Sequence, residues 1–409
     1  MWKDLTLSFK GFPVLIFYGF IILNFISSDL RNIFFLILLL LVIINTSNLE
    51  FSVSKEEMYF LSIYVFFFAI ILIFYFYHKS PVSEIDNYSR FLFVLPLYFL
   101  FRSVAVDADS FINVLGITAF STFVLSLYLY FFNNPNLDRI GGLTSVSITY
   151  GNMIMTIAIY LIITMFENLN QNRRLLVMFA LACSIFSWSL TMTKGSLIGL
   201  GFVLAYILLS KSFYFNKIYA GATLVIFILI LSFSPIHQTL DRFYNDIKYI
   251  QQQELTEVHK NPKISFSTKE RIFLLVKAKE MILEQPFTGV GYQNFHKRIV
   301  EETYKNNRRY GIAQHDHAHN DFIDLWAKIG IFGFLALGLF YIVNLRFFLK
   351  AVEHSSNNYF AKIGVVTLLS QLGFMLTQSQ LSHHQPTLFF LVILIVVASQ
   401  TLKSNKQSL

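Results

Sequence analysis

The sequence predicts an all-α protein that crosses a membrane about twelve times and carries one hydrophilic helical domain outside the membrane. Its 409 residues are 55% hydrophobic and only 14% charged, whereas soluble domains contain about 25% charged residues. Apolar runs of about 17 or more residues, long enough to cross a bilayer as helices, recur along almost the whole chain. These two observations exclude a soluble protein held by a single anchor.

The apolar runs define three regions. Residues 1–235 contain nine predicted spans, residues 236–320 form a hydrophilic loop domain, and residues 321–409 contain three more spans. The first span follows a short basic lead, and no small-residue cleavage site comes after it, so we expect that span to be retained. The predicted spans are 12–27, 32–47, 58–77, 90–104, 111–132, 149–166, 175–191, 195–210, 216–235, 321–345, 358–376 and 386–402.

Basic residues are unevenly distributed between alternate loops. With the N-terminus in the cytoplasm, the short cytoplasmic segments hold thirteen of them: Lys3, Lys10, Lys55, Arg102, Arg173, Arg174, Lys211, Lys217, Arg346, Lys350, Lys362, Lys403 and Lys406. The short outer loops hold five: Arg31, Lys79, Arg90, Arg139 and Lys194. This bias satisfies the positive-inside rule. Because the basic residues set topology, the net charge of +8 is not evidence for nucleic-acid binding.

The loop domain 236–320 lies on the outer side and carries 13 Lys or Arg and 10 Asp or Glu. Ser267 or Thr268, placed before Glu270 and an apolar run, predicts the start of a helix. Pro286 is expected to end that helix, and Gly289 and Gly291 to form a turn. The helix is expected to pack as a cap on the bundle, and its apolar face could also rest on the bilayer surface and guide a lipid-linked substrate; the two interpretations are compatible. Its expected apolar face consists of Ile272, Leu275, Val276, Ile282 and Leu283.

Three histidines stand at alternate positions just before the tenth predicted span, in "HDHAHNDFIDLWAKIGIFG". In an extended segment His315, His317 and His319 would point the same way. They could bind zinc, form a solvated turn, or supply a general base at the mouth of a membrane cavity, since imidazole titrates near neutral pH. No cysteine is nearby and Asp316 would point away, so we expect no metal site.

Two basic residues favour the general-base interpretation. Lys194 lies in the short turn between the seventh and eighth spans, and Arg271 opens the predicted loop helix. Lys194 could simply snorkel in so short a turn. A cation at a helix start opposes the helix dipole, which suggests a partner anion for Arg271, although snorkelling or the acidic neighbour Glu270 would also explain it. Together with His319, these residues would form a cationic pocket suited to a diphosphate. Asp324, an ionisable residue at the start of the tenth span, is either functional or an interfacial carboxylate hydrated at the membrane lip.

The histidine segment resembles a known signature. His319-Asn320, nine residues, then Gly330 and Gly333 is similar to the motif of bacterial O-antigen ligases, whose superfamily includes O-antigen polymerases and bacterial O-oligosaccharyltransferases. The segment "STKERIFLLVKAKEMILEQPFTGVGYQNF" resembles part of that family's periplasmic domain. The resemblance covers roughly residues 140–345.

The resemblance implies a GT-C-like glycosyltransferase of the bacterial inner membrane, with its active site facing the periplasm. The donor would be a glycan on undecaprenyl pyrophosphate, the acceptor a sugar hydroxyl of lipid A-core, and no metal or nucleotide would be required. The family's essential histidine falls on His319 and one essential arginine on Arg271. The second arginine falls on Lys194, a departure that keeps the charge but loses the bidentate fork. The residues expected to contact substrate are His315, His317, Asn320 and Asp324.

Other activities and contacts remain open. An O-antigen polymerase would use the same donor and pocket, and a protein-glycosylating relative is a third possibility. A lipid-linked glycan flippase is disfavoured, because transporters place ionisable residues at mid-membrane and this chain places them at the outer lip. His383 and His384, between the last two spans, could contact the acceptor or form a plain loop. The segment from Asp138 to Gly142, with Arg139, could touch glycan.

Overall fold

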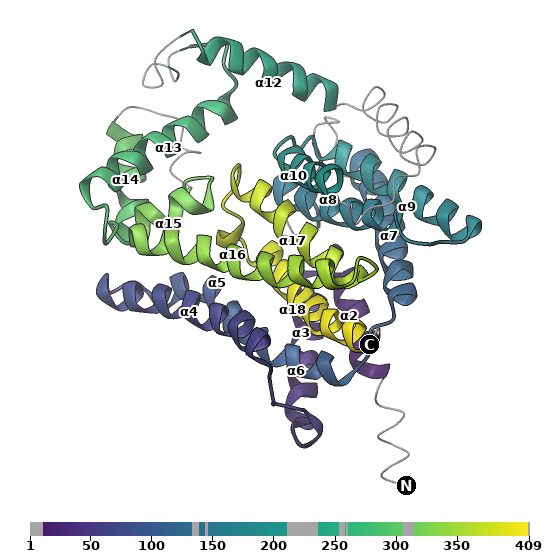
Figure 1. Cartoon of the computed structure of the whole chain (residues 1–409). Helices are drawn as coiled ribbons and strands as arrows, with labels where there is room; N and C mark the ends of the chain where they lie inside the picture. The colour runs from purple at the N-terminus through teal and green to yellow at the C-terminus, as the bar shows by residue number, and fades with distance from the viewer. Residues whose placement is uncertain are drawn as a thin grey trace.

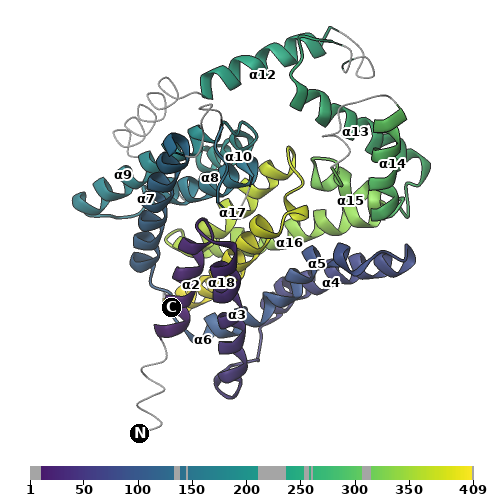
Figure 2. The ribbon, with the colours of Figure 1, turned by 180° about the vertical axis from the view of Figure 1, so that it is seen from behind.

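The computed structural model describes residues 11–132, 139–143, 146–210, 236–252, 258, 261–305 and 315–407. Within these residues every regular element is helical and no strand occurs, which confirms the predicted all-α class. Figures 1 and 2 show a bundle of helices with α12, α13 and α14 on its outside. The N-terminal part of the bundle contains α2 (Phe12–Leu23), α3 (Ser28–Ile44), η2 (Thr46–Asn48), α4 (Lys55–Tyr77), α5 (Val82–Phe93), α6 (Leu95–Ser103), α7 (Ala108–Phe132), α8 (Ser147–Thr164), α9 (Gln171–Leu190) and α10 (Ser196–Leu209).

The remaining elements form the outer domain and the end of the bundle. The outer helices are α12 (Ile236–Ile250), α13 (Phe266–Glu284) and α14 (Tyr292–Lys305). The C-terminal elements are α15 (Asp321–Ile329), α16 (Ile331–His354), α17 (Tyr359–Met375), η5 (Gln380–Ser382) and α18 (His384–Gln407).

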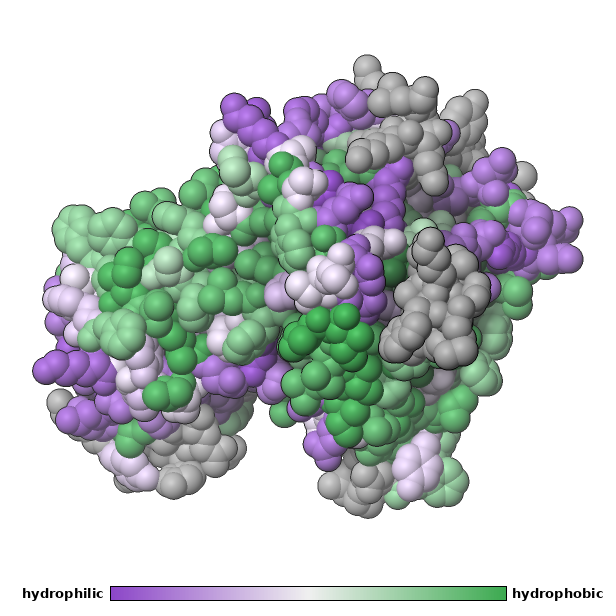
Figure 3. All heavy atoms as spheres, turned by 90° about the horizontal axis from the view of Figure 1, so that it is seen from below, coloured by the Kyte–Doolittle hydropathy of each residue, from purple (hydrophilic) through white to green (hydrophobic). Residues whose placement is uncertain are grey.

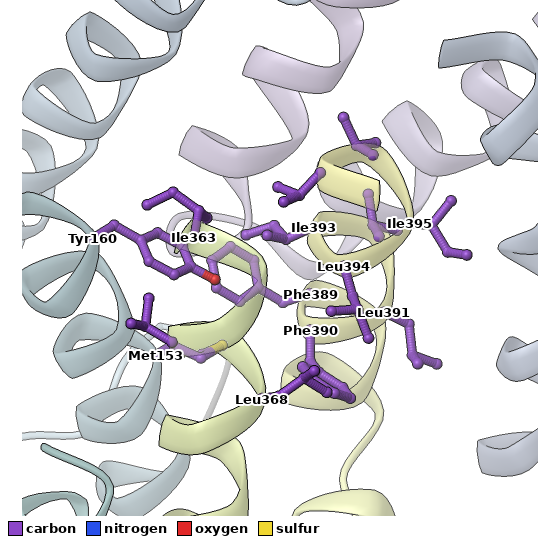
Figure 4. Close-up of a cluster of buried hydrophobic side chains, with 14 of the residues drawn as sticks. Met153, Tyr160, Ile363, Leu368, Phe389, Phe390, Leu391, Ile393, Leu394 and Ile395 are labelled. Atoms are coloured by element: carbon purple, nitrogen blue, oxygen red, sulfur yellow. The ribbon is translucent and has the colours of Figure 1, made fainter. Parts of the chain in front are cut away.

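The centre of the bundle is formed by α8, α17 and α18. The apolar stretches of α8 and α18 are 89% and 94% buried, against 28% for α4 and 39% for α16. Figure 4 shows how side chains of α18 such as Phe389 pack toward Tyr160 of α8 and Ile363 of α17. Tyr160 Oη also lies 2.8 Å from Thr367 Oγ1. The peripheral bundle helices α4 and α16 therefore present most of their apolar surface outward.

Close helix approach also depends on small residues. A Cβ atom added to Gly373 of α17 would collide with the backbone of Gly199 on α10. Such backbone-to-backbone contact is typical of membrane helices, where dispersion rather than water exclusion drives association. The pair explains why α10 and α17 can pack so closely.

The exposed surface fits a lipid environment. Six described helices are long and apolar enough to cross a membrane, and three shorter apolar helices accompany them. The face in Figure 3 exposes large hydrophobic areas, which water-exposed monomers rarely do. The length and apolar composition of these helices thus indicate a multi-pass membrane protein. The total of about twelve spans stays a prediction, and the ninth predicted span, 216–235, lies outside the described residues.

Two predicted spans differ from the structure. The tenth, predicted as one helix over 321–345, is two helices separated at Gly330, whose φ of 76° ends α15. The fourth, predicted over 90–104, is built from α5 and α6, which meet at Val94 just before Pro96. Hydropathy alone cannot resolve such breaks, because the apolar run continues through them.

The start of α13 also differs from the prediction. The helix begins at Phe266 with Ser265 as its N-cap, not at Ser267 or Thr268. The reason is Asp246 of α12, whose carboxylate accepts hydrogen bonds from Ser265 N (2.7 Å), Ser265 Oγ (2.6 Å) and Thr268 Oγ1 (2.7 Å). This long-range anchor could not be inferred from local capping rules.

The buried face of α13 differs from the predicted one: of the five predicted residues, Ile282 packs against the core of this helix, whereas Leu283 is exposed. The face that packs consists of Phe273, Leu274, Ala278 and Met281, in a small core with residues of α14 and α15. The expected cap on the bundle is therefore observed, with its helix rotated. The helix ends at Glu284 before Pro286, and Gly289 and Gly291 form the expected turn with φ of 66° and 86°.

Candidate active site

The candidate site forms where two loops meet: residues 315–320, which lead into α15, and residues 376–383, between α17 and α18. Asp321 ties the loops together, because its buried carboxylate accepts hydrogen bonds from Gln380 N (2.8 Å) and Leu381 N (3.2 Å). This contact fixes the C-terminal loop against the start of α15.

Asn320 strengthens the same junction. Its side-chain oxygen caps α15 by accepting hydrogen bonds from Phe322 N and Ile323 N, each at 3.1 Å. Its amide nitrogen donates to the Leu376 carbonyl at 3.3 Å. The motif asparagine is therefore an N-cap, and a role in substrate contact remains a prediction.

Asp324 lies under the histidine loop. It is buried, pairs with Lys328 at 2.8 Å, and accepts a hydrogen bond from Ala318 N at 2.8 Å. A hydrated carboxylate at the membrane lip is thus ruled out by the geometry. The pair holds the backbone between His317 and His319, and contact of Asp324 with substrate also remains a prediction.

The three histidines cluster as expected, although in a loop rather than a strand. Ring centroids lie 4.5 Å apart for His317 and His319, and 4.9 Å apart for His315 and His319. His383 from the C-terminal loop joins them, 5.4 Å from His317. Burial lowers the pKa of all four rings, so they are neutral near pH 7.

The hydrogen bonds of Gln378 define the tautomer of His319. Gln378 Oε1 is an acceptor 2.5 Å from His319 Nδ1, so Nδ1 carries the proton. The Gln378 Nε2 amide donates to His383 Nε2 at 2.7 Å. Burial lowers the pKa of His319 to about 3, with smaller contributions from the positive charge of Arg271. A neutral imidazole protonated on Nδ1 leaves Nε2 to accept a proton. With its pKa at about 3, His319 is a weaker base than the near-neutral imidazole expected from the sequence.

The same histidines are also the residues that could hold a metal ion. Ligand nitrogens of His315, His317 and His319 lie within 4.8 Å of one another. Zinc binds nitrogen at about 2.0–2.1 Å, so the rings would have to draw together. The charge of Arg271, which lowers the pKa of His315 and His319, also opposes a cation here.

Lys194 is positioned by a rigid turn between α9 and α10. The indole Nε1 of Trp188 donates to the Thr193 carbonyl at 3.1 Å and to Ser196 Oγ at 2.6 Å. Thr193 Oγ1 donates to the Ser147 carbonyl at 3.0 Å. These buried hydrogen bonds hold the backbone on both sides of Lys194, so the Cα atom that carries its side chain is fixed in position.

A cavity of about 460 Å³ brings the cations together. Its lining includes Arg139, Lys194 and Arg271, with Thr377 on the side of the histidine loops. Burial and the neighbouring charge of Arg139 both lower the pKa of Arg271. Arg139 is anchored through the next residue, because Ile140 N donates to the Leu190 carbonyl at 3.1 Å. None of the histidines lines this cavity; Thr377, next to Gln378, connects it to them. A cavity lined by three cations suits a diphosphate ester.

Comparison with known proteins agrees with this geometry. Residues 179–338 match the family model described as O-antigen ligase. This part of the chain is therefore similar to the O-antigen ligase family. The matched stretch contains Lys194, Arg271 and His319. A Haemophilus influenzae protein described as uncharacterized is 24% identical over 361 residues, which are 83% of this chain and 86% of that protein. The family resemblance predicted from the sequence is confirmed.

The structure adds three residues to the predicted site. Arg139 and His383 carried a signal, since both lie in outer loops, but nothing in the sequence separated them from plain loop residues. Gln378 carried no signal, because a single glutamine near a span end is unremarkable. His384, the neighbour of His383, is exposed and makes no ring contact with the other histidines that the structure describes.

Proposed function

We propose that this chain is a glycosyltransferase that moves a glycan from undecaprenyl pyrophosphate to a sugar hydroxyl of lipid A-core. The reaction would take place at the periplasmic face of the bacterial inner membrane, on a GT-C-like fold. The observation that carries the proposal is a cavity lined by three cations, one of which, Arg271, acts electrostatically on a neutral His319 whose Nδ1 is bonded to Gln378.

The cations would bind the diphosphate of the donor. Arg271 and Arg139 can each clamp phosphate oxygens with two N–H groups, whereas Lys194 binds as a point charge. Lys194 stands where the family usually has arginine, and Arg139 would restore the lost fork from another loop. His315 and His317 would border the donor or acceptor sugar.

The transfer would be a single displacement. The acceptor hydroxyl oxygen forms a bond to the anomeric carbon, and the bond from that carbon to the diphosphate oxygen breaks. His319 Nε2 takes the hydroxyl proton, while Lys194, Arg271 and Arg139 stabilise the charge that grows on the departing undecaprenyl pyrophosphate. In-line attack inverts the anomeric configuration. The mechanism assigns no step to a metal or nucleotide cofactor.

An O-antigen polymerase is the second candidate. It would use the same donor and cation pocket, but its acceptor would be a second lipid-linked glycan. The His-Asn motif followed by Gly330 and Gly333, and the description of the matching family, favour the ligase.

A lipopolysaccharide gel of a deletion strain tests the proposal and separates the two candidates. The ligase predicts bare core, with polymer of normal length accumulating on the carrier lipid, and rescue by wild type but not by His319→Ala expressed at the same level. Core that carries a single repeat unit would instead identify a polymerase. A normal ladder in the deletion strain would refute both.

A further inference from the structure

A second cavity lies far from the histidines, between α4 and α16, and has a volume of about 770 Å³. The two helices run antiparallel. Near one end the rings of Phe60 and Phe347 are 4.6 Å apart, and near the other end those of Phe74 and Phe332 are 5.9 Å apart. The cavity is therefore a groove that follows the helix axes.

Apolar residues line the groove in two rows. On α4, Tyr59 and Phe66 are seven residues apart, and on α16, Leu339 and Val343 are four apart, so each pair lies on one helix face. Tyr59, Phe66 and Leu339 are exposed. From Leu339 to Lys350 the groove extends about 16 Å at the helical rise of about 1.5 Å per residue. This length is about half of a hydrocarbon core of about 30 Å, or one leaflet.

Positive charge gathers at one end of the groove only. Lys55, Arg346 and Lys350 line it there, together with a single carboxylate, Glu56. Lys350 pairs with Glu56, whereas Arg346 has no ion pair with any residue that the structure describes. Lys55 lies 6.0 Å from the ring centre of Tyr59. Two of the three positive charges therefore remain without a compensating carboxylate in the lining.

The charged end is the one opposite the candidate active site. At the far end of α4, His78 hydrogen-bonds the Thr288 carbonyl of the outer domain at 2.8 Å. The cations belong to segments that the distribution of Lys and Arg assigns to the cytoplasm. Basic pockets between membrane helices on that side are suited to acidic lipid headgroups.

We propose that this groove binds one anionic phospholipid of the cytoplasmic leaflet. The headgroup phosphate contacts Arg346 and Lys55, and one acyl chain lies between the two apolar rows. A polyprenyl-linked donor does not fit this position, because its diphosphate belongs at the opposite end of the bundle. That exclusion rests on the proposed transferase function, whereas the binding of an anionic phospholipid in this groove does not.

Native mass spectrometry of the full chain in detergent tests the proposal. The probes are phosphatidylglycerol and phosphatidylethanolamine with identical acyl chains. Wild type should retain phosphatidylglycerol preferentially. The double variant Lys55→Gln with Arg346→Gln should bind it about tenfold or more weakly, while its binding of phosphatidylethanolamine stays unchanged.

Two control proteins keep the result interpretable. Lys279→Gln with Lys297→Gln removes the same charge from exposed positions of the outer domain and should behave as wild type. Lys55→Arg with Arg346→Lys retains the charge and should keep the preference. Wild type without a preference, an unchanged double variant, or equal weakening of both lipids would overturn the proposal.

Discussion

His319 and the turn before Lys194 share an uncommon backbone conformation. Among the described residues, positive φ occurs at three residues other than glycine, and two of them are His319 (56°) and Met192 (51°). This left-handed region is disfavoured for residues with a Cβ atom, and such strain concentrates at functional sites. The conformation of His319 directs its ring toward Gln378, where the hydrogen bond defines the tautomer.

The lowered pKa of His319 predicts how activity depends on pH. Because its pKa is about 3, the base is present above that pH and is lost only as the pH falls through it. The acid limb of kcat/KM, which reports the free enzyme, should therefore lie well below the ordinary histidine pKa of about 6.5. An acid limb near 6.5 that disappears in His319→Ala would contradict this assignment.

Lys194 is predicted to act through its charge. Lys194→Arg should retain activity, whereas Lys194→Ala should lower kcat/KM about 100-fold, the cost typical of one lost stabilising donor. The remote variant Lys297→Ala serves as the control. Full activity of Lys194→Ala would remove this lysine from the site.

At the residue scale, sequence reasoning reached the groups with a strong local signal. The alternating histidines, Lys194 and Arg271 were predicted; the structure clusters the histidines in one loop and places Lys194 and Arg271 in the lining of one cavity. Gln378 and His383 could not be predicted as partners of His319, because their proximity depends on Asp321 joining loops about 60 residues apart in the sequence.

At the scale of elements, Gly330 is the joint that sets α15 apart from α16. Its φ of 76° is unfavourable for other residues, and an added Cβ would collide with the Phe287 backbone. The Gly289–Gly291 turn packs against the end of α15, since Val290 N donates a hydrogen bond to the Ala327 carbonyl at 2.9 Å. The outer domain is thereby fastened to the helix that carries the motif.

Substitution at this joint should therefore be costly. Gly330→Ala is expected to destabilise the protein by about 1–3 kcal/mol, seen as a lower unfolding temperature in detergent. Gly338→Ala lies inside α16, where an added Cβ meets no atom within 4 Å, and should be neutral or slightly stabilising. Equal effects of both substitutions would show that the joint imposes no special demand.

The elements that sequence reasoning located best are the long apolar helices. Hydropathy reveals where a chain crosses a bilayer, because a polar backbone must be paired within each span. It does not reveal where a helix is interrupted, as at Val94 and Gly330. It also does not reveal hydrogen bonds between distant residues, such as those of Asp246. The face on which α13 packs depended on α14 and α15, so its own periodicity did not identify it.

At the scale of the whole molecule, the bundle has two chemically different ends. One holds the histidine loops, the cation cavity and the outer domain. The other holds ion pairs between the basic segments predicted to be cytoplasmic and nearby carboxylates, such as Lys362 with Glu167 at 2.9 Å and Arg102 with Glu57 at 3.4 Å. This polarity predicts that the site faces the periplasm.

Cysteine labelling tests that orientation. In a Cys183→Ser background, Lys297→Cys should react with a membrane-impermeant maleimide in intact spheroplasts. Glu353→Cys, exposed at the other end of the bundle, should react only after lysis. The reverse pattern would place the histidines on the cytoplasmic side.

The central claim is that His319 takes the proton of the attacking acceptor hydroxyl while the glycan is transferred from its diphosphate carrier. The most direct measurement is an assay of the purified protein with undecaprenyl-pyrophosphate-linked glycan as donor and lipid A-core as acceptor. The rate of glycan transfer is measured from the amount of undecaprenyl pyrophosphate released. His319→Ala should lower the rate by about 100-fold or more, while the exposed neighbour variant His384→Ala should remain near wild type. Transfer by His319→Ala at the wild-type rate would contradict the mechanism.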